Sequence, residues 1–127
     1  MLLRNLQFLF VVTLFFFSLS AVATAGSQPG WSGKTKSEMV SGCVAAITKN
    51  VVTQFRQQSN LKSTESLPPE IQEALDTQFV PEFKKACTCT VDKVAAEHSY
   101  AEVERDDGIL KRAAALIGSP QGCPMNL

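Results

Sequence analysis

The chain has 127 residues, with 12 basic and 12 acidic side chains and a formal net charge of zero at pH 7. Acidic and basic residues are interspersed without a long run of either sign, whereas nucleic-acid binding normally needs a basic patch or stripe. We therefore expect no nucleic-acid partner. The length is enough for one compact core and too short for two.

Residues 1–25 are predicted to be a cleaved secretory signal peptide. Arg4 is their only charged residue, and residues 6–22 are almost entirely apolar. Ala23-Thr24-Ala25 has the small-x-small pattern that a signal peptidase accepts, which places cleavage between Ala25 and Gly26. The alternative is a retained membrane anchor, because an apolar stretch of about 17 residues is near the lower limit for spanning a bilayer. The signal predicts a periplasmic or secreted protein that contacts a membrane only through the uncleaved signal.

A polar leader over residues 26–34 precedes the first predicted helix, residues 35–58. Thr35-Lys36-Ser37-Glu38 fits a capping box, in which the threonine hydroxyl and the glutamate carboxylate bind free amides of the first turn. Apolar residues then recur every three or four positions, which is the spacing of one face of an amphipathic helix. These residues are Met39, Val40, Cys43, Val44, Ile47, Val51 and Phe55.

A polar loop from Ser59 to Leu67, closed by Pro68-Pro69, leads to a short second helix over residues 70–79. Pro81 has no amide hydrogen and disfavours the helical conformation at the residue before it, so we expect the helix to break or kink at Val80. A third helix is predicted to start at Pro81 and to end near His98.

Ser99-Tyr100-Ala101-Glu102 forms a second capping box and opens a fourth helical stretch. Asp106-Asp107-Gly108 is expected to interrupt this stretch, and Gly118-Ser119-Pro120 to end it before a short tail. No strand-like alternation occurs along the chain. The predicted fold is all-α, a small bundle of about four helices in residues 35–127, stapled by two disulfides.

The chain has four cysteines, Cys43, Cys87, Cys89 and Cys123, and in a short exported chain these most economically form two disulfides. Residues two apart on a helix point about 200° from each other, so Cys87 and Cys89 cannot easily serve one partner. Cys43 and Cys87 both lie on apolar stripes, and this favours the pairs Cys43–Cys87 and Cys89–Cys123. The swapped pairing remains the alternative.

Two chemical interpretations of the Cys87-x-Cys89 motif compete with a structural role. A catalytic thiol usually lies at the start of a helix, where its pKa is lowered, but Cys87 is two turns into the third helix. A metal site would need His98 as well, which on a continuous helix lies about 16 Å from Cys87. Metal ligands must lie within a few ångström of each other, so we expect neither a metal nor another cofactor.

Several of these features together resemble a group of small exported bacterial helical proteins. The resemblance rests on Trp31-Ser32, Cys43 within the first helix, Cys87-x-Cys89 followed by Val91-Asp92-Lys93-Val94, and Ser99-Tyr100-Ala101-Glu102. It covers most of the chain after residue 26. It implies an exported helical domain and no particular activity.

The sequence favours a non-enzymatic domain that binds a protein partner, such as an inhibitor or immunity-type protein of the cell envelope. Stapled helices, mixed surface charge and the lack of a catalytic set support this hypothesis. One alternative is a carrier of a small apolar ligand; another is a thiol–disulfide protein that uses Cys87 and Cys89. The carrier would have a cavity among the first three helices, although at this spacing the same residues are more often plain core. Its lining would be Val44, Ile47, Val51, Leu75, Phe79 and Phe83.

Overall fold

The computed structural model describes residues 26–127, which contain only helices, turns and loops. The elements are α2 (Gly33–Gln58), α3 (Pro69–Ala74), the π-helical turn η1 (Leu75–Phe79), α4 (Val80–Glu97), α5 (Tyr100–Arg105) and α6 (Gly108–Ala115). This architecture confirms the predicted small all-α bundle. The predicted signal peptide, with Ala25 of its cleavage site, lies outside the described residues.

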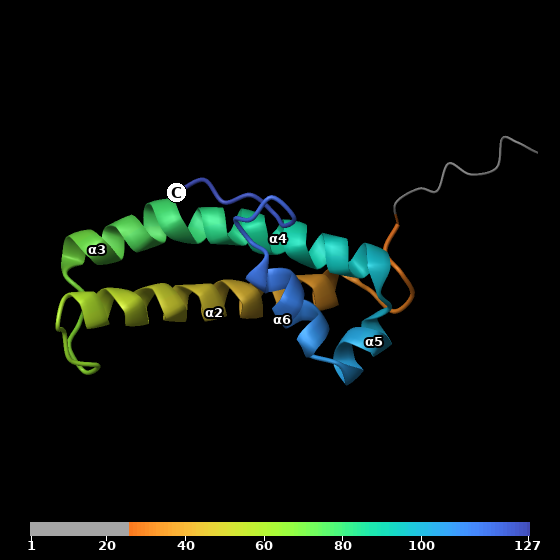
Figure 1. The fold of residues 1–127 in the computed structure, drawn as a ribbon, viewed down its shortest axis with the longest axis horizontal. Helices are drawn as coiled ribbons and strands as arrows, with labels where there is room; N and C mark the ends of the chain where they lie inside the picture. The colour runs from red at the N-terminus through yellow and green to blue at the C-terminus, as the bar shows by residue number, and fades with distance from the viewer. Residues whose placement is uncertain (1–25) are drawn as a thin grey trace, which may run out of the picture.

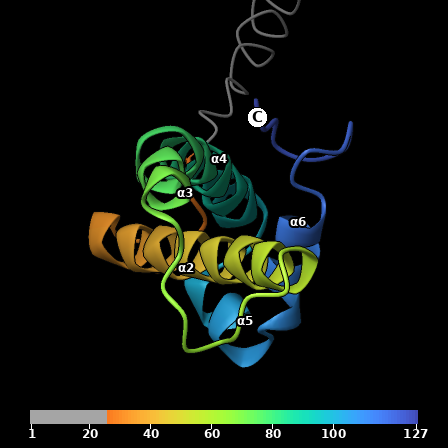
Figure 2. The same ribbon diagram turned by 90° about the vertical axis from the view of Figure 1, so that its left-hand side faces the viewer.

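A long antiparallel hairpin forms the frame of the molecule. Helix α2 lies alongside α4, and α3 and η1 extend α4 toward the far end of α2 (Figure 1). Helix α6 packs against α4, and the C-terminal tail returns across α4 (Figures 1 and 2). Helix α4 is therefore covered from several sides and supplies most of the core. Its buried residues are Phe83, Ala86, Cys87, Thr90, Val91, Val94 and Ala95.

The two disulfides have the pairing that the sequence favours. Cys43–Cys87 joins α2 to α4, and Cys89–Cys123 joins α4 to the tail, each with a Cα–Cα distance of 5.9 Å. Cys87 has no exposed surface, whereas Cys89 is half-buried. The two cysteines thus leave α4 on different sides, as their spacing on the helix predicts.

Helix α2 begins two residues earlier than predicted, because Ser32 caps it in place of Thr35. The Ser32 hydroxyl accepts a hydrogen bond from the Thr35 amide at 3.1 Å, and the Thr35 hydroxyl accepts one from the Ser32 amide at 2.9 Å. Ser32 has an extended backbone, as an N-cap residue needs, while Gly33 and Lys34 take helical conformations. The capping box predicted between Thr35 and Glu38 is therefore wrong, and Thr35 is its third helical residue.

Of the break or kink predicted at Val80, the break does not occur. The backbone stays helical from Ala74 through Val80, and the Val80 amide donates to the Leu75 carbonyl five residues before it. This wider π turn contains one residue more than an α turn needs. It gives room for the ring of Pro81, which in a regular α-helix clashes with the carbonyl four residues earlier. The proline is thus accommodated by η1, and α3, η1 and α4 are continuous.

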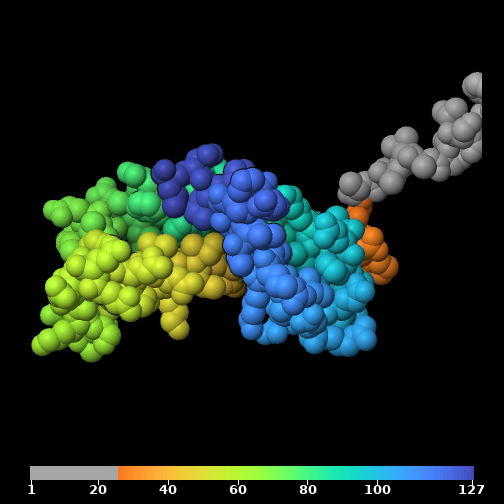
Figure 3. Space-filling view, in the orientation of Figure 1, coloured from red at the N-terminus to blue at the C-terminus, as the bar shows by residue number. Residues whose placement is uncertain are grey.

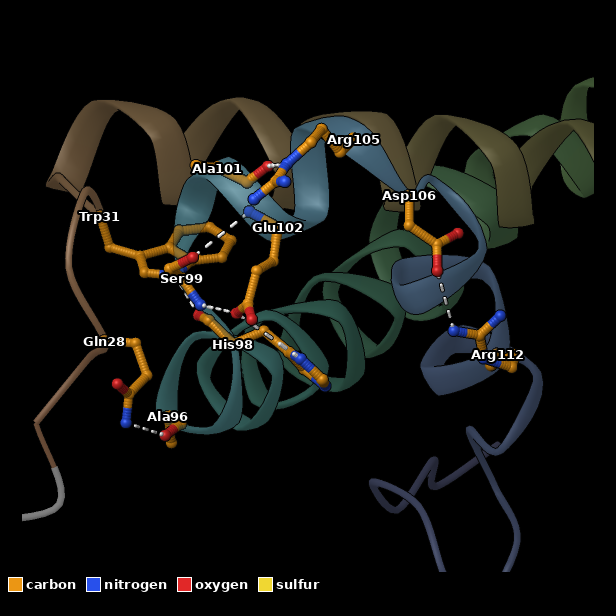
Figure 4. Close-up of polar contacts among 10 residues, drawn as sticks. All are labelled: Gln28, Trp31, Ala96, His98, Ser99, Ala101, Glu102, Arg105, Asp106 and Arg112. Atoms are coloured by element: carbon orange, nitrogen blue, oxygen red, sulfur yellow. Dashed lines mark hydrogen bonds and ion pairs between the residues drawn. The ribbon is translucent and has the colours of Figure 1, made fainter.

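The predicted polar leader packs against the end of α4. We call residues 28–31 the N-terminal strap. The backbone amide of Gln28 donates to the Ala95 carbonyl at 2.7 Å, and its side chain donates to the Ala96 carbonyl at 3.1 Å. The Trp31 indole donates to the His98 carbonyl at 2.8 Å (Figure 4). The strap therefore satisfies carbonyls that the C-terminal end of a helix leaves without a partner.

The predictions for the last third of the chain are confirmed. Ser99 and Glu102 form the capping box of α5, with the Glu102 carboxylate accepting from the Ser99 amide at 2.7 Å. The chain leaves the helical conformation at Asp106 and restarts as α6 at Gly108. Gly118 has a φ of +82°, which suits glycine and reverses the chain after α6.

Candidate functional site

Both cysteines of the Cys-x-Cys motif are in disulfides in this fold. All four cysteines are in disulfides, and the sulfur of Cys87 is enclosed in the core with that of Cys43, which is 7% exposed. Thiol–disulfide exchange requires an attacking thiolate to reach a sulfur, and Cys87 has no exposed surface at which this can happen. Cys89, which is half-buried, is the most accessible of the four.

The surroundings of His98 are explained by helix capping. Its Nδ1 lies 3.9 Å from the Glu102 carboxylate, which already accepts the Ser99 amide (Figure 4). Hydrogen bonds from the backbone and hydroxyl of Ser99 lower the pKa of Glu102 below its ordinary value of 4.5. Within residues 26–127 no group of three or more His, Cys, Asp or Glu side chains is placed to hold a metal ion.

The six residues predicted to line an apolar cavity do not surround one space. Val51, Leu75 and Phe79 line a pocket at the α3 end of the hairpin, and Ile47 lines a different crevice beside α6. Phe83 is fully buried in the core. Val44 is half-buried and lines neither space. The residues divide between two spaces because one space lies between α2 and α6, whereas the other lies between α2 and the segment of α3 and η1.

We call the first space the α2–α6 crevice. It has a volume of about 380 Å³ and lies between the middle of α2 and one face of α6. Its walls are mainly small or apolar side chains, with one amide and one ammonium group. The lining residues are Gly42, Cys43, Ala46, Ile47, Asn50, Leu110, Lys111, Ala114 and Ala115.

An ion pair stands at the edge of this crevice. Lys111 Nζ lies 2.5 Å from a carboxylate oxygen of Asp107, one turn earlier. The hydrogen bond from Lys111 lowers the pKa of Asp107, and the same bond raises the pKa of Lys111. Both side chains are exposed, so the pair contributes little to stability. The crevice therefore has mainly apolar walls, and the ion pair places charge at its rim.

We call the second space the distal pocket. It has a volume of about 170 Å³ and is lined by α2, the end of the loop, α3 and η1. Every lining residue is apolar: Val51, Val52, Phe55, Leu67, Ile71, Ala74, Leu75 and Phe79. A neighbouring surface hollow of about 350 Å³ shares Val52 with it and includes Lys49 and Arg56.

Sequence reasoning found part of both spaces and missed the rest. The apolar stripe of α2 identified Ile47 and Val51, and the periodicity of the next helix identified Leu75 and Phe79. The small residues Ala46 and Ala115 were missed, because alanine carries no strong periodic signal and occurs at exposed and buried positions alike. Their role depends on where α6 lies, which the sequence of α2 does not indicate.

Comparison with models of protein families, with curated proteins and with solved structures finds no match. The resemblance to small exported helical proteins therefore stays a prediction. Among residues 26–127, none of the helices combines the length and the apolar character needed to cross a bilayer. The two disulfides are typical of an oxidising, extracellular environment.

Proposed function

We propose that this chain is an exported, non-enzymatic interaction domain that binds a protein partner through the α2–α6 crevice. The observation that carries the proposal is the incomplete burial of α2. Cys43 is the only buried residue of this 26-residue helix, although the helix has a long apolar stripe. The other apolar residues of the stripe are half-buried, and partly open apolar surface beside a crevice can mark an interaction site.

The side chains of the crevice suit a protein partner. Gly42, Ala46, Ala114 and Ala115 are small, so a partner's backbone or helix can approach closely between α2 and α6. Ile47 and Leu110 supply apolar contact, while Asn50 and Lys111 provide polar groups at the edge. An apolar centre within a polar rim is the common arrangement of protein–protein interfaces.

The crevice is also held in a fixed shape. The Cys43–Cys87 disulfide lies at its floor and ties α2 to α4, against which α6 packs. In the space-filling view, α6 crosses the hairpin and leaves α2 uncovered toward the α3 end (Figure 3). A rigid site loses less conformational entropy on binding than a flexible one. An inhibitor or immunity-type role in the cell envelope is consistent with such a pre-formed surface.

Site-specific photo-crosslinking tests the proposal. A benzophenone amino acid replaces Ala46 in the crevice or, as the control, Lys84, which is exposed on α4 and lies outside both spaces. The proteins are exposed to cell-envelope and secreted fractions and irradiated. We expect a discrete adduct from position 46 only, and we expect Ala114→Arg to abolish it while leaving the circular dichroism spectrum unchanged. Equal adducts from both positions, or none from position 46, would refute the crevice as the docking site.

A further inference from the structure

The distal pocket has the chemistry of a hydrocarbon-binding site. Its eight lining residues present no polar side chain. The pocket opens to the surface, and its volume of about 170 Å³ is close to that of an enclosed apolar cavity of about 150 Å³ that binds benzene. A space of this kind offers water no hydrogen bonds, so transfer of an apolar group into it is favourable.

The distal pocket lies where the backbone of α2 makes few close contacts with α3 and η1. Helix α2 packs closely along α4 but not along α3 and η1, so the far end of the hairpin is less tightly joined than its middle. The π turn places Leu75 and Phe79 on the same pocket wall, and Leu67 approaches from the end of the loop. Single π turns within helices are frequently found at functional sites.

The surface beside the pocket is cationic. Val52 forms a wall of both the distal pocket and the neighbouring hollow. In that hollow Lys49 and Arg56 lie about two turns apart on α2, one turn to either side of Val52. The Arg56 guanidinium donates to the carbonyls of Lys62 and Ser63, which fixes its charge at the loop. Among residues 26–127, Lys49 takes part in no ion pair. The loop carboxylate of Glu65 accepts the Lys62 amide at 2.9 Å.

We propose that the distal pocket binds the hydrocarbon tail of a medium-chain fatty acid, with the carboxylate at the cationic hollow near Lys49. The apolar lining selects the tail, and the positive charge beside Val52 selects an anionic head over a neutral one. The pocket and the α2–α6 crevice share no lining residue, so this proposal does not depend on the docking role of the crevice.

Titration of the oxidised protein with sodium octanoate, followed by calorimetry and by amide chemical shifts, tests the proposal. We expect saturable binding, with the largest shifts at Val51, Leu75 and Phe79. Ala74→Leu fills the pocket and should weaken octanoate binding on the order of tenfold or more. The matched control, Ala46→Leu, adds the same side chain in the α2–α6 crevice and should leave octanoate binding unchanged. Circular dichroism verifies that both variants are folded.

The head group is tested with Lys49→Gln and with 1-octanol. Because exposed ion pairs contribute little, we expect Lys49→Gln to weaken octanoate binding by about two- to fivefold and to leave octanol binding unchanged. Absence of saturable octanoate binding would overturn the proposal. So would octanoate binding that is unaffected by Ala74→Leu, or octanol binding as tight as that of octanoate. The chemical shifts of the unsubstituted protein decide the position of the tail independently of any variant.

Discussion

Replacement of Cys43 and Cys87 by alanine is expected to remove most of the stability of this domain. The disulfide joins residues 44 apart in sequence. On the chain-entropy model, a loop of this length makes the bond worth about 4 kcal/mol at 25 °C. Both sulfurs lie in the core, so their loss also leaves a void, which adds about 1 kcal/mol. The total, about 5 kcal/mol, is comparable to the whole stability of a small domain.

The Cys89–Cys123 disulfide provides a matched control for this prediction. Its residues are 34 apart in sequence, so the same model gives about 3.8 kcal/mol, nearly the same value. However, this bond fastens the tail, which can detach while α2, α4 and α6 stay packed. The freedom that the detached tail gains in the folded state offsets part of the loss. The Cys89→Ala/Cys123→Ala variant should therefore lose clearly less stability than the Cys43→Ala/Cys87→Ala variant.

Urea unfolding followed by circular dichroism at 222 nm measures both changes. We expect the Cys43→Ala/Cys87→Ala variant to be partly unfolded before urea is added, and the Cys89→Ala/Cys123→Ala variant to retain a cooperative transition at a lower midpoint. A loss of stability in the Cys43→Ala/Cys87→Ala variant no larger than that in the Cys89→Ala/Cys123→Ala variant would refute this explanation. So would a decrease of less than about 2 kcal/mol in the free energy of unfolding when Cys43 and Cys87 are replaced, because this is half of the value from the chain-entropy model.

Three further predictions concern the tail, the strap and the capping box. A Cβ at Gly122 would lie 1.9 Å from the Leu116 carbonyl oxygen, so Gly122→Ala should displace the tail and leave free thiols that a thiol titration detects. The control is Gly42→Ala, whose Cβ meets no atom within 4 Å and which should leave no free thiol. Trp31→Phe removes the indole hydrogen bond to the end of α4 and should cost about 1 kcal/mol in urea unfolding; an unchanged midpoint would contradict the role of the strap. The capping hydrogen bonds lower the pKa of Glu102 below 4.5. The stability that the Glu102 carboxylate contributes is therefore present above pH 4.5 and is lost as the pH falls through the lowered pKa. Thermal melts from pH 6 to pH 2 should show that Glu102→Gln loses less stability on acidification than the unsubstituted protein.

The helices and their ends were largely predictable, because they depend on residues close together in the chain. The apolar spacing in residues 39–55 predicted α2, and the Ser99–Glu102 pattern predicted the start of α5. The two incorrect predictions also concern residues close together in the chain. Two hydroxyl residues, Ser32 and Thr35, compete for one cap, and Ser32 takes it because Gly33 and Lys34 can join the helix. Pro81 predicted a break because sequence rules assume an α-helical turn, and η1 is not one.

The cysteine pairing depends both on the local spacing along each helix and on the long-range packing of the chain. The stripe positions of Cys43 and Cys87 on two helices predicted that they would meet, because both helices must bury their apolar faces in the same core. Only the folded chain excludes the swapped pairing, since it brings Cys123 to the side of α4 that carries Cys89. The sequence therefore reduced the choice, and the packing decided it.

The sequence by itself determined the helical class, most helix ends and the use of the cysteines as staples. These follow from hydrogen bonds within one turn and from apolar periodicity along one helix. Only the tertiary structure decided that the apolar stripe of α2 is half covered, that α6 opens a crevice beside Ala46, and that η1 and Leu67 enclose a separate pocket. These spaces arise where helices distant in sequence fail to meet. The distance between two helix surfaces depends on the packing of the whole chain, and no single segment encodes it.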